Sequence, residues 1–134
     1  MTNSWTDLIL GKPWLEHALG PDSFDCWGVV HFGFKTQRDI ELPKYLYVSS
    51  EGFRQQGVNE SDYPQWLRLS VPEDFSLAGL SMGERITHVG LFLDINGGSI
   101  LHCRQDSGVI MQSIRAMKSQ GWRTIRFYRW QNFS

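Results

Sequence analysis

The heptapeptide FDCWGVV at residues 24–30 lies where a loop is predicted to become a helix. Gly20 and Pro21, just before it, are strong turn-forming residues, and residues 27–34 are mostly apolar. This pattern indicates a buried helix over about residues 26–35, although so short an apolar run also fits a strand. In a helix, Cys26 would lie in the first turn, where unpaired backbone N–H groups and the helix dipole favour thiolate over thiol.

Two interpretations of Cys26 follow from this position. A cysteine at a helix N-terminus has a lowered pKa and acts as a nucleophile. Free cysteine is also among the most buried side chains, so Cys26 can equally be an ordinary core residue. Cys103 is the second cysteine of the sequence. Two cysteines do not make a disulfide framework, and although the two could pair, the count fits a reducing compartment equally well.

The composition predicts one folded domain over residues 1–134. Hydrophobic residues make up 41% of the chain and the formal net charge is -1, which gives no reason to expect binding to nucleic acid or to a membrane. The N-terminus lacks the basic and apolar regions of a signal peptide, and no apolar run approaches membrane-spanning length. We therefore expect a protein that is cytoplasmic as synthesised.

The second half of the chain has the alternating pattern of strands. Residues 87–94 and 99–103 flank the turn-forming sequence Asn-Gly-Gly at 96–98 and predict a hairpin. Further strands are predicted at 66–71, 108–114 and 124–130, with a short connection of about one helical turn over 115–120. Residues 72–84 are ambiguous.

The first half of the chain has the signals of helices. One helix is predicted at 4–10 with Asn3 or Ser4 as N-cap, and a weak polar helix capped by Ser49 or Ser50 is predicted to reach Gln56. Residues 57–65 are predicted to be loop. The expected fold class is α+β, in which N-terminal helices pack on an antiparallel β-meander.

Two histidines are predicted to meet on this meander. Strand alternation puts His88 and Gly90 on one face, and His102 on the same face of the return strand. The aliphatic residues of both strands then face the core. Imidazoles on the same side of adjacent strands come within hydrogen-bond reach. The missing side chain of Gly90 is expected to leave room for a helix or a substrate.

Cys26, His88 and His102 together supply a nucleophile, a base and a group that orients the base. Each histidine alone can equally be an ordinary half-exposed strand residue. The three side chains could also hold zinc with a water molecule. Against zinc, the chain lacks closely spaced ligand pairs such as C-x-x-C or H-E-x-x-H. We therefore expect neither a metal ion nor a cofactor.

Over most of residues 11–114 the sequence resembles the NlpC-type cysteine peptidases, which are bacterial and phage peptidoglycan endopeptidases with a papain-like core. The resemblance is carried by the blocks at residues 11–14, 24–30, 88–93, 100–102 and 108–110. It implies that Cys26 is the nucleophile, His88 the base and acid, and His102 the residue that orients His88. It also implies cleavage of peptidoglycan stem peptides beside a D-glutamyl residue through a thioacyl-enzyme.

The sequence departs from the family at two aromatic positions. Trp14 stands where the family usually has a tyrosine whose hydroxyl helps the oxyanion site, and Trp27 where it usually has a serine. We expect Trp14, Asp25 and Trp27 to contact substrate, and core packing is the alternative for both tryptophans. The exchange to Trp27 also leaves open a catalytically impaired tail-assembly or binding module. The same acyl-enzyme would serve a transglutaminase-like acyltransferase.

The Asp-Cys-Trp-Gly form of the cysteine block, at residues 25–28, resembles family members found in phage tails and prophages. This resemblance implies phage-tail proteins as partners. It also implies delivery to the cell wall as part of a tail, since no leader sequence is expected to carry the chain there.

Overall fold

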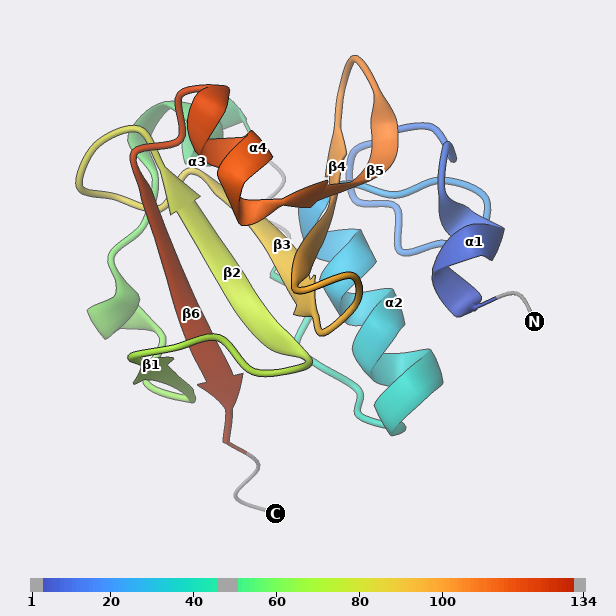
Figure 1. Cartoon of the computed structure of the whole chain (residues 1–134), viewed down its shortest axis with the longest axis horizontal. Coiled ribbons are helices and arrows are strands. Elements are labelled where there is room, and N and C mark those ends of the chain that lie inside the picture. The colour runs from blue at the N-terminus through green and yellow to red at the C-terminus, as the bar shows by residue number, and fades with distance from the viewer. Residues whose placement is uncertain (1–3, 46–50, 132–134) are drawn as a thin grey trace.

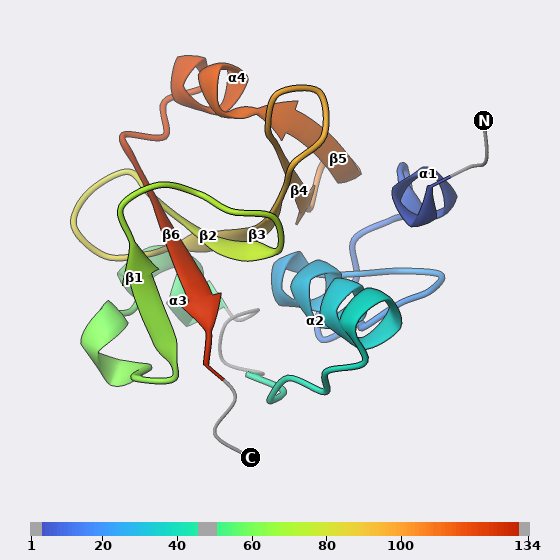
Figure 2. The same cartoon turned by 60° about the horizontal axis from the view of Figure 1, so that its bottom comes forward.

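The computed structural model describes residues 4–45 and 51–131, in which an antiparallel sheet of six strands has helices on both faces (Figures 1 and 2). The elements are, in chain order, α1 (Trp5–Ile9), α2 (Cys26–Arg38), α3 (Glu51–Gln56), the 3-10 helix η2 (Glu60–Asp62), β1 (Trp66–Leu69), β2 (Ser76–Ser81), β3 (His88–Leu93), β4 (Ser99–Arg104), β5 (Gly108–Ser113), α4 (Ile114–Ser119) and β6 (Thr124–Trp130). The predicted α+β class is confirmed.

The strand order is β1-β6-β2-β3-β4-β5. Strands β2 to β5 form the predicted type of antiparallel meander, each pairing with the next. The last strand departs from this pattern, because β6 crosses back after α4 and pairs with β1 and β2 instead of β5. The expectation that residues 124–130 extend the meander was therefore wrong.

Helix α2 begins at Cys26 because the preceding residue caps it. The Asp25 carboxylate accepts a hydrogen bond from the Gly28 N–H at 2.7 Å, which satisfies a backbone donor that has no partner within the helix. The helix ends where Asp39 adopts a left-handed conformation, with φ 56°, and its N–H bonds to the Phe34 carbonyl. The predicted start is confirmed, and the helix runs three residues beyond the predicted end at residue 35.

Two hydrophobic clusters lie on opposite faces of the sheet. Helix α2 packs against the face that carries Leu91 and Leu101, and its Val29 and Val30 are fully buried there. Helix α4 covers part of the other face, with Met117 in contact with a second cluster. Figure 2 shows α2 and α4 on opposite sides of the sheet. The face that carries the histidines is therefore packed as well.

Strand β2 was missed in the sequence because it is buried along its whole length. A strand that is covered on both faces has no polar alternation to reveal it. Ala78 packs in one cluster and Leu77 in the other. Gly79 follows Ala78, and a Cβ there would lie 2.9 Å from Ile86 Cδ1, so a larger residue at this position would force the Ile86 side chain to shift.

The smaller elements follow the predictions in part. Helix α1 has Ser4 as its N-cap, while Asn3 lies outside the described residues. Helix α3 ends at Gln56 as predicted, and the two candidate caps Ser49 and Ser50 also lie outside the described residues. The predicted loop at 57–65 contains η2.

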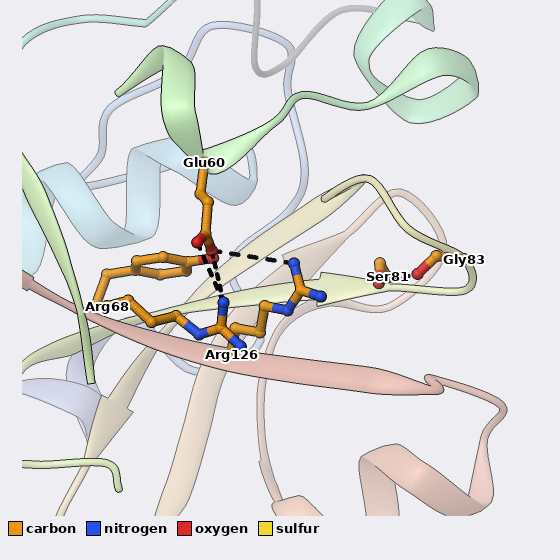
Figure 3. Close-up of polar contacts among 6 residues, drawn as sticks. Glu60, Arg68, Ser81, Gly83 and Arg126 are labelled. Atoms are coloured by element: carbon orange, nitrogen blue, oxygen red, sulfur yellow. Dashed lines mark hydrogen bonds and ion pairs between the residues drawn. The ribbon is translucent and has the colours of Figure 1, made fainter. Parts of the chain in front are cut away.

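Glu60 ties η2 to the edge of the sheet (Figure 3). Its carboxylate accepts hydrogen bonds from the Arg68 guanidinium at 3.0 and 3.1 Å and from the Tyr128 hydroxyl, and it lies 3.9 Å from Arg126 Nη1. The hydrogen bond from Tyr128 and the charges of the two arginines hold the pKa of Glu60 below its ordinary value. The carboxylate is therefore a structural anion that joins η2, β1 and β6.

Replacing Glu60 with alanine is expected to lower the free energy of unfolding by about 1–3 kcal/mol. The Tyr128 side chain is only 2% exposed, so its hydroxyl would be left buried without its acceptor. Urea unfolding of the purified variant measures the loss. Glu73→Ala is the matched control, because Glu73 pairs with Arg129 at the surface and its removal should cost less than about 1 kcal/mol. Equal losses would show that Tyr128 does not depend on Glu60.

Candidate active site

Cys26 occupies the first turn of α2, as the sequence predicted, and its side chain is 7% exposed. The helix start is fixed on both sides by Asp25, whose second carboxylate oxygen accepts the His17 N–H at 2.6 Å. Asp25 therefore joins the loop before the helix to the first turn. This arrangement presents the Cys26 sulfur at a defined place beside the start of β3.

The electrostatic environment of Cys26 differs from the expectation for a helix N-terminus. Burial and the nearby Asp25 carboxylate raise the pKa of the Cys26 thiol to about 12, and the backbone N–H groups of Trp27 and Val89 oppose this rise only in part. The expected lowering of the pKa was therefore wrong. Desolvation penalises a thiolate more than the helix N–H groups stabilise it, so the resting form of Cys26 is the thiol.

The two histidines meet as predicted. His88 begins β3 and His102 lies near the end of β4, and His88 Nε2 is 2.9 Å from His102 Nδ1. The rings are nearly perpendicular, at 76°. Burial lowers the pKa of both histidines, to about 4 for His102 and well below the ordinary value for His88. Both rings are therefore neutral at pH 7.

Two neighbours hold this pair in place. The Trp122 indole stacks on the His88 ring at a centroid distance of 5.3 Å and an angle of 18°. Gly90 lies beside His102, since a Cβ there would be 3.0 Å from His102 Cβ and 2.8 Å from Ile100 Cγ2. The space at Gly90 is therefore taken by the partner strand, and the expectation that it admits a helix or a substrate was wrong.

Cys26 and His88 line the same cleft, which has a volume of about 440 Å³. Trp122 and Trp14 contribute to its walls, and His102 is fully buried behind His88. The nucleophile and base candidates thus share one solvent-accessible space. His102, the third candidate, has no exposed surface and is separated from the cleft by His88.

The three residues expected at the substrate lie in different places. Trp14 lines the cleft. Asp25 is 1% exposed and its carboxylate bonds to backbone N–H groups, so it acts as a helix cap. Trp27 points away from the cleft: its Nε1 donates to the Pro43 carbonyl at 2.9 Å, and its ring lines a separate apolar cavity of about 50 Å³. Neither Asp25 nor Trp27 is among the described residues that line the cleft.

Three groups at the site were not singled out from the sequence. Gln112 Oε1 lies 2.8 Å from His102 Nε2, and Arg54 and Arg104 are among the residues that line the cleft. Strand alternation could have placed Gln112 on the histidine face, because Ile110 pairs with His102 and Gln112 is two residues further on. No periodic pattern indicates the arginines.

Cys103 lies in the core as expected. Its side chain is 1% exposed, and its Sγ donates to the Phe24 carbonyl at 3.3 Å. Both cysteines are free thiols. Within residues 4–45 and 51–131, no group of three or more His, Cys, Asp or Glu side chains could hold a metal ion. No helix in this part of the chain is long and apolar enough to span a bilayer.

Comparison with known proteins identifies the fold and the family of the chain. Fourteen chains of solved structures match the fold. One is the NlpC/P60 domain of the peptidoglycan hydrolase SagA, which is 15% identical, has a TM-score of 0.59, and is matched over 91% of each chain. No curated protein sequence matches at a significant level. Because residues 11–129 match the NlpC/P60 family, this chain belongs to that family.

Proposed function

We propose that this protein is a cysteine endopeptidase that cleaves the peptide stems of peptidoglycan beside a D-glutamyl residue. Membership of the NlpC/P60 family and the fold shared with a domain of a peptidoglycan hydrolase support this class of reaction. The observation that carries the proposal is the shared cleft of Cys26 and His88, in which the far nitrogen of His88 is held 2.9 Å from His102.

The proposed chemistry starts from a neutral pair. As the Cys26 sulfur attacks the amide carbonyl, His88 Nδ1 accepts the thiol proton, and the C–N bond then breaks while His88 donates that proton to the leaving amine. Water then attacks the thioester and gives a proton to His88, and as the C–S bond breaks His88 returns that proton to the Cys26 sulfur, which releases the acyl group as a carboxylic acid. We assign the Cys26 backbone N–H and the Trp14 indole N–H to the developing oxyanion.

The charge of the cleft supports an acidic substrate. Arg54 and Arg104 contribute two guanidinium groups, while Asp106 contributes one carboxylate, whose oxygen is 3.9 Å from Arg104 Nε. Arg54 also lies over the Trp14 ring at 5.8 Å from its centroid. A D-glutamyl residue that is linked through one carboxyl group keeps the other as a carboxylate. Such an anion complements the net positive lining.

The test uses two soluble stem peptides that differ only at the D-glutamyl residue, one with the free carboxylate and one with its amide. We expect mass spectrometry to show cleavage beside this residue, with kcat/KM about tenfold higher for the carboxylate. Arg104→Gln should reduce this preference toward unity. Arg115→Gln is the matched control, because Arg115 is exposed on α4.

Three results would contradict the proposal in different ways. Binding without cleavage would favour the binding module. A new amide formed with an added amine would favour the acyltransferase. Cleavage at a bond remote from the D-glutamyl residue would remove the specificity but not the enzyme class.

We further propose that the protein reaches the cell wall as part of a phage tail. The support is the resemblance of the Asp-Cys-Trp-Gly form at residues 25–28 to tail-associated family members. Detection of the chain by mass spectrometry in purified tail particles tests this link. Its absence from such particles would contradict the link and leave the peptidase proposal intact.

A further inference from the structure

Behind the histidine pair, a third polar group completes a chain of hydrogen bonds across three neighbouring strands. Gln112 on β5 is 2.8 Å from His102 on β4, and His102 is 2.9 Å from His88 on β3. His102 has no exposed surface and His88 is 9% exposed, so neither ring exchanges these contacts freely for water. Because a neutral imidazole has one donor and one acceptor nitrogen, the direction of each hydrogen bond fixes the direction of the next.

The direction of this chain of hydrogen bonds is set at the end that Gln112 forms. The group that faces His102 Nε2 is the Oε1 of Gln112, a carbonyl oxygen that can only accept. His102 must therefore carry its proton on Nε2, which leaves Nδ1 of the neutral ring as an acceptor. His88 Nε2, the atom opposite that acceptor, must then carry the proton of its own ring. In neutral His88 the one unprotonated nitrogen is Nδ1.

We propose that Gln112 is a positioning residue that fixes the tautomers of His102 and His88 and thereby keeps His88 Nδ1 unprotonated. A neutral imidazole can take a thiol proton only through its unprotonated nitrogen, so the wrong tautomer has no base to offer. Gln112 touches neither the cleft nor Cys26 among the described contacts and acts through His102 alone. Its catalytic consequence rests on the proposed function, whereas the tautomer assignment does not.

The residues around these three hydrogen-bonded side chains hold both histidine rings in their orientations. Trp122 stacks on one face of His88, and Gly90 allows His102 to lie close to β3, so both rings have little room to turn. Ile100, which pairs with Gln112 across β4 and β5, is fully buried. A ring flip of His102 would place a carbon atom opposite Gln112 and leave the hydrogen bond between the two side chains unmade.

The test reads the tautomers directly. Long-range ¹⁵N–¹H NMR spectra of the purified wild-type protein at pH 7.5 are expected to show His88 and His102 each as a single tautomer with the proton on Nε2. Gln112→Leu, which cannot accept a hydrogen bond, should give mixed tautomers at both rings. Gln112→Glu should restore the wild-type pattern, because a carboxylate also accepts. Met111→Leu, on the opposite face of β5, is the matched control and should change nothing.

Steady-state kinetics supply the second readout. Gln112→Leu is expected to lower kcat by about 10-fold to 100-fold with little change in KM, and Gln112→Glu should recover most of it. If Gln112 had only a structural role, Gln112→Leu would not combine a fall in kcat at nearly constant KM with a change of the histidine tautomers. Thermal unfolding identifies any variant that fails to fold. In that case the NMR spectrum of the wild-type protein still shows which tautomers His88 and His102 adopt.

The outcomes separate this proposal from the proposed function. A proton on Nδ1 of either ring in the wild type, or unchanged tautomers in Gln112→Leu, would overturn the role of Gln112 even if the protein cleaves peptidoglycan. The expected tautomers in a protein that cleaves no peptide would support the assignment and leave the peptidase proposal without support.

Discussion

Replacing Cys26 with alanine is expected to abolish peptide hydrolysis, with a fall in kcat of about 10⁴-fold or more. The sulfur is the atom that would form the thioester, and alanine offers no substitute. The fold should survive, because the side chain lost is small, is 7% exposed, and is not the cap of α2. The assay is the release of stem-peptide fragments, with circular dichroism and thermal unfolding to establish that the variant is folded.

Cys103→Ala is the control for this experiment. Cys103 is equally small and even more buried, at 1% exposed, and although it also lines the cleft, its Sγ donates a hydrogen bond to the Phe24 carbonyl. It should keep most of the wild-type activity. If Cys26→Ala keeps full activity, or if Cys103→Ala loses as much, the assignment of the nucleophile is wrong. A folded Cys26→Ala protein that still binds the stem peptide would show that recognition and chemistry are separable.

Acidification is expected to destabilise the protein between about pH 6.5 and pH 4. Burial lowers the pKa of His102 to about 4, and burial likewise lowers the pKa of His88 and His31. In this range the unfolded chain binds protons that the folded chain excludes, so the free energy of unfolding falls as the pH falls. For His102 alone, a shift from about 6.5 to about 4 corresponds to roughly 3 kcal/mol at pH 4.

Urea unfolding at pH 7.5, 6, 5 and 4 measures this dependence. Carboxylates also contribute to acid unfolding, so the informative quantity is the difference from a variant. His102→Asn keeps an acceptor near His88 but cannot titrate, and it should lose less stability on acidification than the wild type. His17→Asn, at an exposed histidine, should follow the wild type. Identical slopes for His102→Asn and the wild type would contradict the prediction.

The neutral resting states of Cys26 and His88 also bear on the mechanism. With the pKa of the thiol raised and that of the imidazole lowered, a thiolate–imidazolium pair is not the resting form. In the proposed mechanism, proton transfer to His88 therefore accompanies the attack of the sulfur, as in general-base catalysis. In the proposed mechanism His88 acts as a base only when neutral, so its lowered pKa is expected to extend activity to pH values below the ordinary histidine range.

The elements that the sequence predicted well are those with a strong local signal. The capping carboxylate of Asp25 marks the start of α2, and the Asn-Gly-Gly turn at 96–98 defines the β3–β4 hairpin. The period of two in these strands was enough to predict that His88 and His102 meet. Their catalytic roles, and that of Cys26, stay predictions until activity is measured.

What the sequence did not reveal depends on tertiary contacts. Strand β2 is buried on both faces and has no alternation, and the return of β6 between β1 and β2 is a matter of sheet topology. Trp122 lies in the short connection between α4 and β6, where no period applies. The raised pKa of Cys26 arises from burial, which its position at a helix start does not disclose.

The two side chains proposed as nucleophile and base lie against different hydrophobic clusters. Cys26 belongs to the cluster under α2, whereas His88 rests on Trp122, which belongs to the cluster on the opposite face. Core substitutions on the α4 side, at Phe92 or Phe127 for example, are therefore expected to disturb His88 more than Cys26. If the proposed roles hold, evolution or protein engineering could adjust proton transfer and the position of the sulfur as separate traits, each through its own set of interior residues.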